Sequence, residues 1–447
     1  MQNALVSAYG YWWKKRRYGG AFEDELYKCK NHESMTIEAL HEYQTLMLRK
    51  LLQHAFQNVP FYSRKYKAAG FIADDFKRFE LEDLKKLPIL EKEELRKFGN
   101  STLLSSNRDK MGSFFLSSGS TGTPVQVYLS EFVHQKIMAA YEARVRNWAG
   151  LDRAMARGMI GGRRVVNDAN AEPPYFRYNI FEKQVYFSAY HINNRNSENY
   201  LYGMRKHGIA YMSGYAMSNY HLAQFFLEKE LTPPQLKAIL TSSEKLTAPM
   251  RLLLNKTYQC ETFDAYSSVE NCGLISENEF HQKLISEDIG IVEVLDEFNN
   301  DTTEGALIST GFLNFDQPLI RYRIGDFIKL ADQQEAKCKR PFRIVEEVIG
   351  RTEDVVLGLD GRKMVRFHSL FLDIKNLQRA QIIQQGDGEI EIIIQAQQPI
   401  NKEGITLIEQ RLKSQLGDVN TTFTMVNEIP LTLNGKFKAV ISNIKLR

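Results

Sequence analysis

Short runs of β-forming residues alternate with helix-like stretches between residues 114 and 330. The β-rich runs include residues 114–116, 239–240, 291–295 and 306–308. Such alternation is typical of α/β proteins, in which helices cover the faces of a sheet. The chain has 447 residues, which is long enough for more than one domain. We therefore predict an α/β fold whose large N-terminal domain consists of layered β-sheets and helices.

The sequence after Gly350 has a different pattern. A hairpin pattern at 353–364, a strand at 389–395 and a helix near 405–416 predict a small α+β domain. A last hairpin is expected to turn at Asn434-Gly435. We therefore divide the chain into an N-terminal arm at 1–35, a first domain at 36–350 and a small C-terminal domain at 351–447.

The N-terminal region contains aromatic residues beside a basic run. Trp12 and Trp13 precede four consecutive cations that end at Arg17. This mixture fits a peripheral contact with a membrane interface or with a protein partner. It also fits an arm whose aromatic rings pack on the protein while its charges stay in water. Residues 36–59 follow with apolar side chains at helical steps, which predicts an amphipathic helix that Pro60 ends.

Composition excludes several classes of protein. Lysine and arginine exceed aspartate and glutamate by only 58 − 54 = 4, so nucleic acid is not an expected partner. The four cysteines include no Cys-x-x-Cys pair, which indicates a reducing cytoplasm and no zinc ribbon. No apolar run has the roughly 18 residues that a membrane-spanning helix needs, and no signal peptide is recognised.

A loop of small residues lies between the apolar run that ends at Leu116 and an alternating strand that begins at Val125. Glycines let the backbone approach a phosphate, and hydroxyl groups add uncharged donors. The loop is no Walker motif, because it has neither the Gly-Lys-Ser/Thr ending nor a following helix. An ordinary flexible hairpin turn is the alternative interpretation. Its residues are Ser117, Ser118, Gly119, Ser120, Thr121, Gly122 and Thr123, followed by Pro124.

Further segments accompany this loop in an order that resembles the adenylate-forming ligases, specifically their phenylacetate–CoA ligase-like branch. The loop is similar to that family's phosphate-binding loop. Residues 241–244 and 264–270 resemble its two nucleotide-pocket segments, and residues 322–326 resemble its ribose-binding turn. Residues 350–354 resemble its interdomain hinge, and residues 434–436 its C-terminal lysine loop. The resemblance covers the chain from about residue 51 to the end.

This resemblance implies roles for particular residues in nucleotide binding. Tyr266 is expected to stack on adenine, with Asp264 or Ser243 and Glu244 near the edge of the base. Asp326 is expected to accept hydrogen bonds from both ribose hydroxyls, a task that suits the paired oxygens of a carboxylate. The remaining nucleotide-binding residues that the resemblance implies are Ser267, Ser268 and Arg351, whose planar guanidinium suits ribose or phosphate oxygens.

The resemblance also implies the catalytic residues and the cofactors. ATP is the expected co-substrate, and Glu270 is the expected ligand of magnesium, which neutralises phosphate oxygens. Lys436 is expected to bring its charge to the reacting phosphorus and the acyl oxygen. The small domain is expected to be mobile about a hinge at Glu353 and Asp354, which would couple the arrival of Lys436 to a domain rotation.

Within the family, the greatest likeness is to a group of capsular polysaccharide biosynthesis proteins, which also resemble synthetases that adenylylate a deazaflavin coenzyme. The sequence departs from many relatives in the loops. Thr123 replaces a lysine, Ser267 a glycine and Val269 a threonine, while Glu353 stands at a hinge position that is commonly aspartate. The loss of the threonine hydroxyl at position 269 removes one donor from the expected phosphate site.

The resemblance implies an enzyme that activates a carboxylic acid as an acyl-adenylate and transfers the acyl group to coenzyme A or to an amine. The amine could belong to an amino acid or to a sugar of a surface polysaccharide. Two alternatives stay open: a nucleotidyltransferase that moves AMP onto a hydroxyl, and a non-catalytic scaffold of a polysaccharide assembly. A homodimer is a further expectation that no pattern in the sequence decides.

Overall fold

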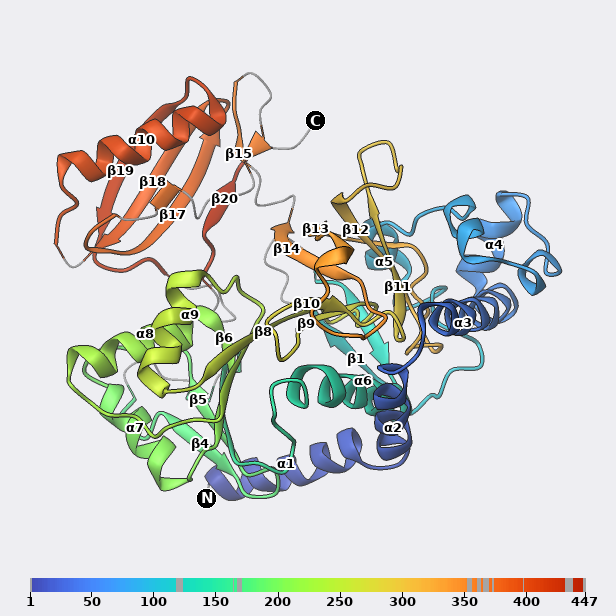
Figure 1. The fold of residues 1–447 in the computed structure, drawn as a ribbon, viewed down its shortest axis with the longest axis horizontal. Helices are drawn as coiled ribbons and strands as arrows, with labels where there is room; N and C mark the ends of the chain where they lie inside the picture. Colours follow the sequence, from blue (N-terminus) through green and yellow to red (C-terminus); the bar gives the residue numbers. More distant parts are fainter. Residues whose placement is uncertain are drawn as a thin grey trace. The chain divides into compact units, whose positions relative to one another are not determined.

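The computed structural model describes residues 2–117, 124–163, 165–166, 171–351, 356–359, 363–364, 370–371, 374–396, 398–430 and 437–444. The chain divides into two compact units (Figure 1). The larger unit comprises Met1–Ile324 and Lys329–Glu347, and the smaller comprises Gly325–Ile328 and Val348–Arg447. Helices and a large layered sheet make up the larger unit, so the predicted α/β class is confirmed.

The large sheet has twelve strands among the described residues, in the order β11-β12-β13-β14-β10-β9-β8-β7-β6-β3-β5-β4. The part of the sheet next to the β4 edge strand is parallel, because β3 pairs in parallel with β5 and β6, and β7 pairs in parallel with β6 and β8. The parallel strands are β3 (Arg157–Gly161), β5 (Gln184–Ser188), β6 (Tyr211–Tyr215), β7 (Ala238–Ser242) and β8 (Glu261–Ser267). The others are β4 (Phe176–Asn179), β9 (Leu274–Glu277), β10 (Lys283–Ile285), β11 (Gly290–Leu295), β12 (Glu304–Gly311), β13 (Tyr322–Leu330) and β14 (Ile344–Arg351).

Helices cover both faces of the parallel strands. Because side chains alternate between the faces of a strand, successive residues of β6 enter different cores. Met212 packs in the cluster that contains side chains of α7, α8 and α9. Tyr211 packs in the cluster that contains side chains of α2 and α6. These helices are α2 (Phe22–His32), α6 (Glu131–Tyr141), α7 (Ser197–Lys206), α8 (Ala216–Glu228) and α9 (Ala248–Tyr258).

The helix predicted at 36–59 is confirmed as α3 (Ile37–Asn58). The Thr36 side chain caps its start by accepting a hydrogen bond from the Ala39 backbone N–H. Val59 has extended backbone angles, as expected for a residue before proline, and Pro60 ends α3 by starting the next helix. The following elements are α4 (Pro60–Ala68), α5 (Lys92–Phe98) and the antiparallel hairpin β1 (Ser113–Leu116) and β2 (Gln126–Leu129).

The smaller unit has a four-stranded sheet in the order β19-β18-β17-β20. Helix α10 (Lys402–Leu416) packs Ile408, Leu412 and Leu416 into a core shared with Ile382 and Ile392. The strands are β15 (Val356–Leu357), paired with β16 (Lys363–Met364), and β17 (Leu377–Gly386), β18 (Glu389–Ala396), β19 (Asn420–Val426) and β20 (Val440–Ser442).

The hairpin expected at Asn434-Gly435 is not formed by the strands on either side of that turn. Strands β19 and β20 lie at opposite edges of the small sheet, separated by β18 and β17. Each instead pairs in parallel with a central strand, β19 with β18 and β20 with β17. The turn itself lies outside the described residues.

The N-terminal arm forms two helices, α1 (Gln2–Tyr18) and α2. The expectation of packed aromatic rings and solvated charges holds only in part, because Tyr11 and Trp12 are exposed while Arg16 is buried. Arg16 donates from Nη2 to the Leu129 carbonyl at 2.9 Å, at the end of the hairpin β1–β2. The basic run is therefore partly a packing element of the arm. Among the described residues, no helix is long and apolar enough to cross a membrane.

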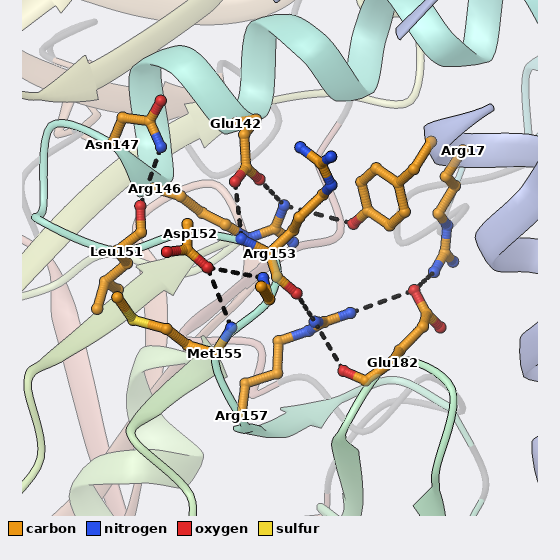
Figure 2. A network of polar contacts seen from close by, with 12 residues as sticks. Arg17, Glu142, Arg146, Asn147, Leu151, Asp152, Arg153, Met155, Arg157 and Glu182 are labelled. Atoms are coloured by element: carbon orange, nitrogen blue, oxygen red, sulfur yellow. Dashed lines mark hydrogen bonds and ion pairs between the residues drawn. The ribbon is translucent and has the colours of Figure 1, made fainter. Parts of the chain in front are cut away.

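A buried carboxylate holds α1 against the edge of the sheet (Figure 2). Glu182 Oε1 accepts hydrogen bonds from Arg17 Nη1 and Arg157 Nη2, each at 3.2 Å. Its Oε2 accepts one from Asn179 Nδ2 at 2.9 Å. Beside this pair, Arg146 is paired at 2.6 Å with Glu142 in a π-helical turn that continues α6. Paired charges can remain buried at this position because each has a partner of opposite sign.

We expect Glu182→Ala to destabilise the protein by about 3 kcal/mol, because the mutation leaves the buried Arg157 guanidinium without its carboxylate. Urea unfolding at neutral pH measures the change in the free energy of unfolding. Glu198→Ala is the matched control, since Glu198 pairs with Lys229 at the surface and should cost less than about 1 kcal/mol. Equal losses in the two variants would contradict this prediction.

Candidate functional site

The small-residue loop closes the hairpin of β1 and β2. Its base is held by two hydrogen bonds: the Ser117 N–H donates to the Val125 carbonyl, and the Val125 N–H donates to Ser117 Oγ, both at 3.0 Å. Strands β1 and β2 pair up to Leu116 and Gln126, next to this base. The loop therefore follows a strand and leads into a strand, as the sequence indicated. Ser118, Gly119, Ser120, Thr121, Gly122 and Thr123 themselves lie outside the described residues.

The two nucleotide-pocket segments meet at the carboxyl ends of neighbouring parallel strands. In the register of β7 and β8, Ser242 lies opposite Ala265. Ser243 and Glu244 directly follow β7, and Tyr266 and Ser267 end β8. The carboxyl ends of parallel strands are where open α/β sheets bind their ligands. Ser243 and Ser267 are exposed, while Tyr266 and Ser268 are half-buried.

The backbone turns sharply after β7. Ser243 has a φ angle of 69°, in the left-handed region that non-glycine residues seldom adopt. Glu244 then points back to α8, and its Oε2 accepts a hydrogen bond from the Met217 N–H at 2.9 Å. This bond satisfies one of the N–H groups that the first turn of a helix leaves open, and it ties the segment between β7 and α9 to the start of α8.

Asp264 joins β7, β8 and β10 through its side chain. Its Oδ1 accepts a hydrogen bond from Thr241 Oγ1 at 2.9 Å, and its Oδ2 lies 3.6 Å from Lys283 Nζ. Burial raises the pKa of Asp264, with Glu277 adding to the rise and Lys283 opposing it. Both oxygens of the Asp264 carboxylate therefore interact with side chains of other strands.

Glu270 lies in the segment after β8 and is buried. Tyr322 Oη, at the start of β13, donates a hydrogen bond to Glu270 Oε1 at 3.0 Å. Burial raises the pKa of Tyr322 and the Glu270 charge raises it further, so the phenol keeps its proton and acts as the donor. A carboxylate oriented by such a donor is the type of oxygen ligand that Mg²⁺ takes in small numbers beside substrate phosphates. Glu270 therefore fits a magnesium site.

Asp326 lies within strand β13, although its segment was expected to be a turn. Burial alternates along this strand, and Asp326 is buried in phase with Ile324 and Ile328. Gly325 has φ 93, so the strand is irregular next to the aspartate. Period-two alternation of apolar residues explains why this stretch is a strand.

The remaining predicted residues fall at the end of β14 and beyond it. Arg351 is the last residue of β14, and the structure describes its backbone. Glu353, Asp354 and Lys436 lie outside the described residues. Their hinge and catalytic roles therefore stay predictions.

Sequence reasoning missed one group that contacts Asp264. Arg251 on α9 forms a two-pronged ion pair with Glu277 on β9, and Glu277 Oε2 also accepts from the Asp264 N–H at 3.0 Å. No local pattern could reveal this group, because its members come from three different elements. Among the described residues, no cluster of three or more metal-ligating side chains is formed.

Comparison with solved structures defines the class of fold. The chain matches a crystal structure of 2-hydroxyisobutyryl-CoA ligase in the postadenylation state, in complex with R3-HIB-AMP, with a TM-score of 0.71. The two are 18% identical, and the match covers 92% of this chain and 91% of the ligase. The fold is therefore that of the adenylate-forming CoA ligases.

Comparison with curated sequences specifies the relatives. The chain is 26% identical to Protein CapK of Staphylococcus aureus over 461 aligned residues, covering 99% of this chain and 97% of CapK. It is 26% identical to phenylacetate-coenzyme A ligase of Thermus thermophilus over 349 residues, 73% of each chain. Residues 359–443 match the family model of the CapK C-terminal domain. The chain is thus homologous to CapK and to the phenylacetate–CoA ligases, and the resemblance to that branch is confirmed.

We expect Tyr322→Phe to lower the free energy of unfolding by about 2 kcal/mol, because the mutation removes a hydrogen bond to a buried carboxylate. Urea denaturation monitored by circular dichroism measures the change. Tyr27→Phe removes a hydroxyl from an exposed ring and should leave stability unchanged. A Tyr322→Phe protein as stable as this control would show that the contact does not hold Glu270.

Proposed function

We propose that the protein is an ATP-dependent, adenylate-forming ligase that activates a carboxylic acid as acyl-AMP and transfers the acyl group to a thiol or an amine. The observation that carries this proposal is the meeting of residues 241–244 and 264–270 at the carboxyl ends of β7 and β8. Homology to the phenylacetate–CoA ligases over most of the chain supports the same chemistry. Coenzyme A is the acceptor named for those relatives.

In the first step of the proposed reaction, a carboxylate oxygen attacks the α-phosphorus of ATP, and the bond from this phosphorus to the bridging oxygen breaks. Pyrophosphate leaves, and the acyl group stays on AMP. In the second step the thiol or amine attacks the acyl carbon, loses its proton and releases AMP. Lys436 would stabilise the charge that develops on the phosphorus oxygens in the first step. Bound magnesium, held by Glu270, would neutralise phosphate charge.

In the proposed nucleotide site, some residues contact the nucleotide and others hold the strands in place. Tyr266 stacks on the adenine ring, and Asp326 accepts from the ribose hydroxyls. Asp264 is engaged by Thr241 and Lys283, which supports a role in holding β7 and β8 together. Ser243, which is exposed, and Glu244, which is half-buried and held by the Met217 N–H, would lie at the edge of the base. Ser117 anchors the loop 118–123 that would surround the phosphates.

We place this reaction in the cytoplasm and in the synthesis of a surface polysaccharide. All four cysteines lie in the described residues and are free, which supports a reducing compartment. Full-length homology to CapK supports the polysaccharide setting. The acid would be joined to coenzyme A or to an amine of an amino acid or sugar.

Lys436→Ala should lower the rate of pyrophosphate release by at least about 100-fold, because it removes a charge that acts only on the transition state. Release is measured with ATP and magnesium over a panel of carboxylic acids and amino acids. Lys402→Ala, at the exposed start of α10, is the control and should keep full activity.

The same assay separates the alternatives. Activity with one class of acid that disappears in Lys436→Ala supports the ligase and identifies its substrate. ATP binding without pyrophosphate release across the panel, together with a stable AMP-bearing product, would instead indicate transfer of AMP to a hydroxyl. Absence of a thermal shift with ATP and magnesium would favour the scaffold.

Glu270→Gln should raise the magnesium concentration for half-maximal activity by about 10-fold or more, since the amide is uncharged and a poorer ligand for a hard cation. Magnesium titrations of pyrophosphate release at saturating ATP measure this shift. Glu261→Gln, an exposed carboxylate at the start of β8, should leave the titration unchanged. An identical magnesium dependence in the two variants would remove Glu270 from the metal site.

A further inference from the structure

Helix α1 and the turn between β4 and β5 expose six large apolar side chains. Tyr11 of α1 and Phe181 of the turn are in ring contact, with centroids 5.1 Å apart, so helix and turn form one surface. We call this surface the α1 face. Its residues and their exposed fractions are Leu5 67%, Tyr9 48%, Tyr11 57%, Trp12 51%, Ile180 61% and Phe181 44%.

The α1 face is held by packing on the larger unit. Lys14 Nζ donates to the Phe181 carbonyl at 3.0 Å. Ser7 Oγ bridges two backbone groups of the β4 edge, donating to the Tyr178 carbonyl at 3.4 Å and accepting from the Ile180 N–H at 3.3 Å. Figure 1 shows α1 running along the margin of the larger unit, beside β4. The exposed aromatic rings are thus presented by a fixed helix.

The charges around the α1 face are positive. Helix α1 contains four lysines and arginines and no acid. Lys14, Lys15 and Lys183 are exposed, whereas the acid of the turn, Glu182, is buried and paired with Arg17 and Arg157. In the following helix, the carboxylates of Glu23 and Glu25 are paired with Arg153 and Lys28, and Asp24 is an exposed acid.

We propose that the α1 face docks the protein onto an anionic lipid bilayer surface, with α1 lying in the plane of the headgroups. Tryptophan and tyrosine prefer this interface, and exposed lysines are attracted to anionic lipids. Lysine is depleted at protein–protein interfaces, so the three lysines favour a lipid surface over a protein partner. The contact does not depend on the proposed ligase activity.

The docking residues differ from those that the sequence suggested. Contact was expected through a segment that begins at Trp12 and ends at Arg17. The side chains of Arg16 and Arg17 are instead directed to Leu129 and Glu182 inside the larger unit. The contact from α1 is therefore made by the exposed side chains of Leu5, Tyr9, Tyr11, Trp12, Lys14 and Lys15.

The full chain is tested by co-sedimentation with vesicles of phosphatidylcholine alone or mixed with phosphatidylglycerol. We expect binding only to the anionic vesicles and a blue shift of tryptophan emission on binding. Trp12 is the exposed one of three tryptophans, so Trp12→Phe should abolish the shift. Lys14→Gln combined with Lys15→Gln should weaken binding about 25-fold, at about fivefold for each lysine near an anionic surface.

Tyr11→Ala combined with Trp12→Ala should abolish vesicle binding. Phe298→Ala is the control: it truncates an exposed ring in the β11–β12 turn and should leave vesicle binding unchanged. Equal binding to neutral and anionic vesicles, no binding to either, or unchanged binding of the double alanine variant would each overturn the proposal. A dimer in sedimentation velocity that depends on Trp12, without vesicle binding, would assign the face to a second copy of the chain.

Discussion

The candidate site depends on the parallel pairing of β7 with β8. Parallel strands end at the same edge of a sheet, so two segments more than twenty residues apart in sequence lie side by side. Helices on both faces stabilise this pairing, because β7 divides its apolar side chains between two cores and β8 adds Phe263 and Ala265 to one of them. The polar ends of the strands then stay at the edge, where Ser243, Glu244, Tyr266 and Ser267 are found.

Buried ion pairs fix the orientation of the N-terminal arm relative to the large sheet. Arg144 is fully buried and paired with Asp288 at 2.9 Å and Glu33 at 2.5 Å, which ties the end of α2 to the turn before β11. Glu182 ties α1 to β3 in the same way. Each contact demands a partner of opposite sign at one position, so these pairs specify the orientation of the arm more strongly than apolar contacts alone. The exposed rings of Tyr11 and Trp12 follow from that orientation.

Local patterns in the sequence predicted the α/β class, helix α3 and the strand-to-strand loop after Ser117. Those features depend on residues close together in the chain, such as Thr36 with Ala39 or Ser117 with Val125. The inward turn of Arg17 could not be predicted, because its partner Glu182 is 165 residues away. The contact of Tyr322 with Glu270 spans 52 residues, so the sequence suggested the two residues separately but not their hydrogen bond. The pairing of β19 and β20 with central strands also depends on distant segments, which the expected turn did not reveal.

Helix α2 provides Phe22, Leu26 and Cys29 to the core that covers β7 and β8. The ribosome releases this helix more than 200 residues before Ala238 and Ala265, the strand residues on which it packs. At typical rates of synthesis, the delay is roughly 10 to 40 s. During that time, the apolar side of α2 has no sheet to cover it. The nascent chain therefore carries an exposed apolar segment until β7 and β8 have been synthesised.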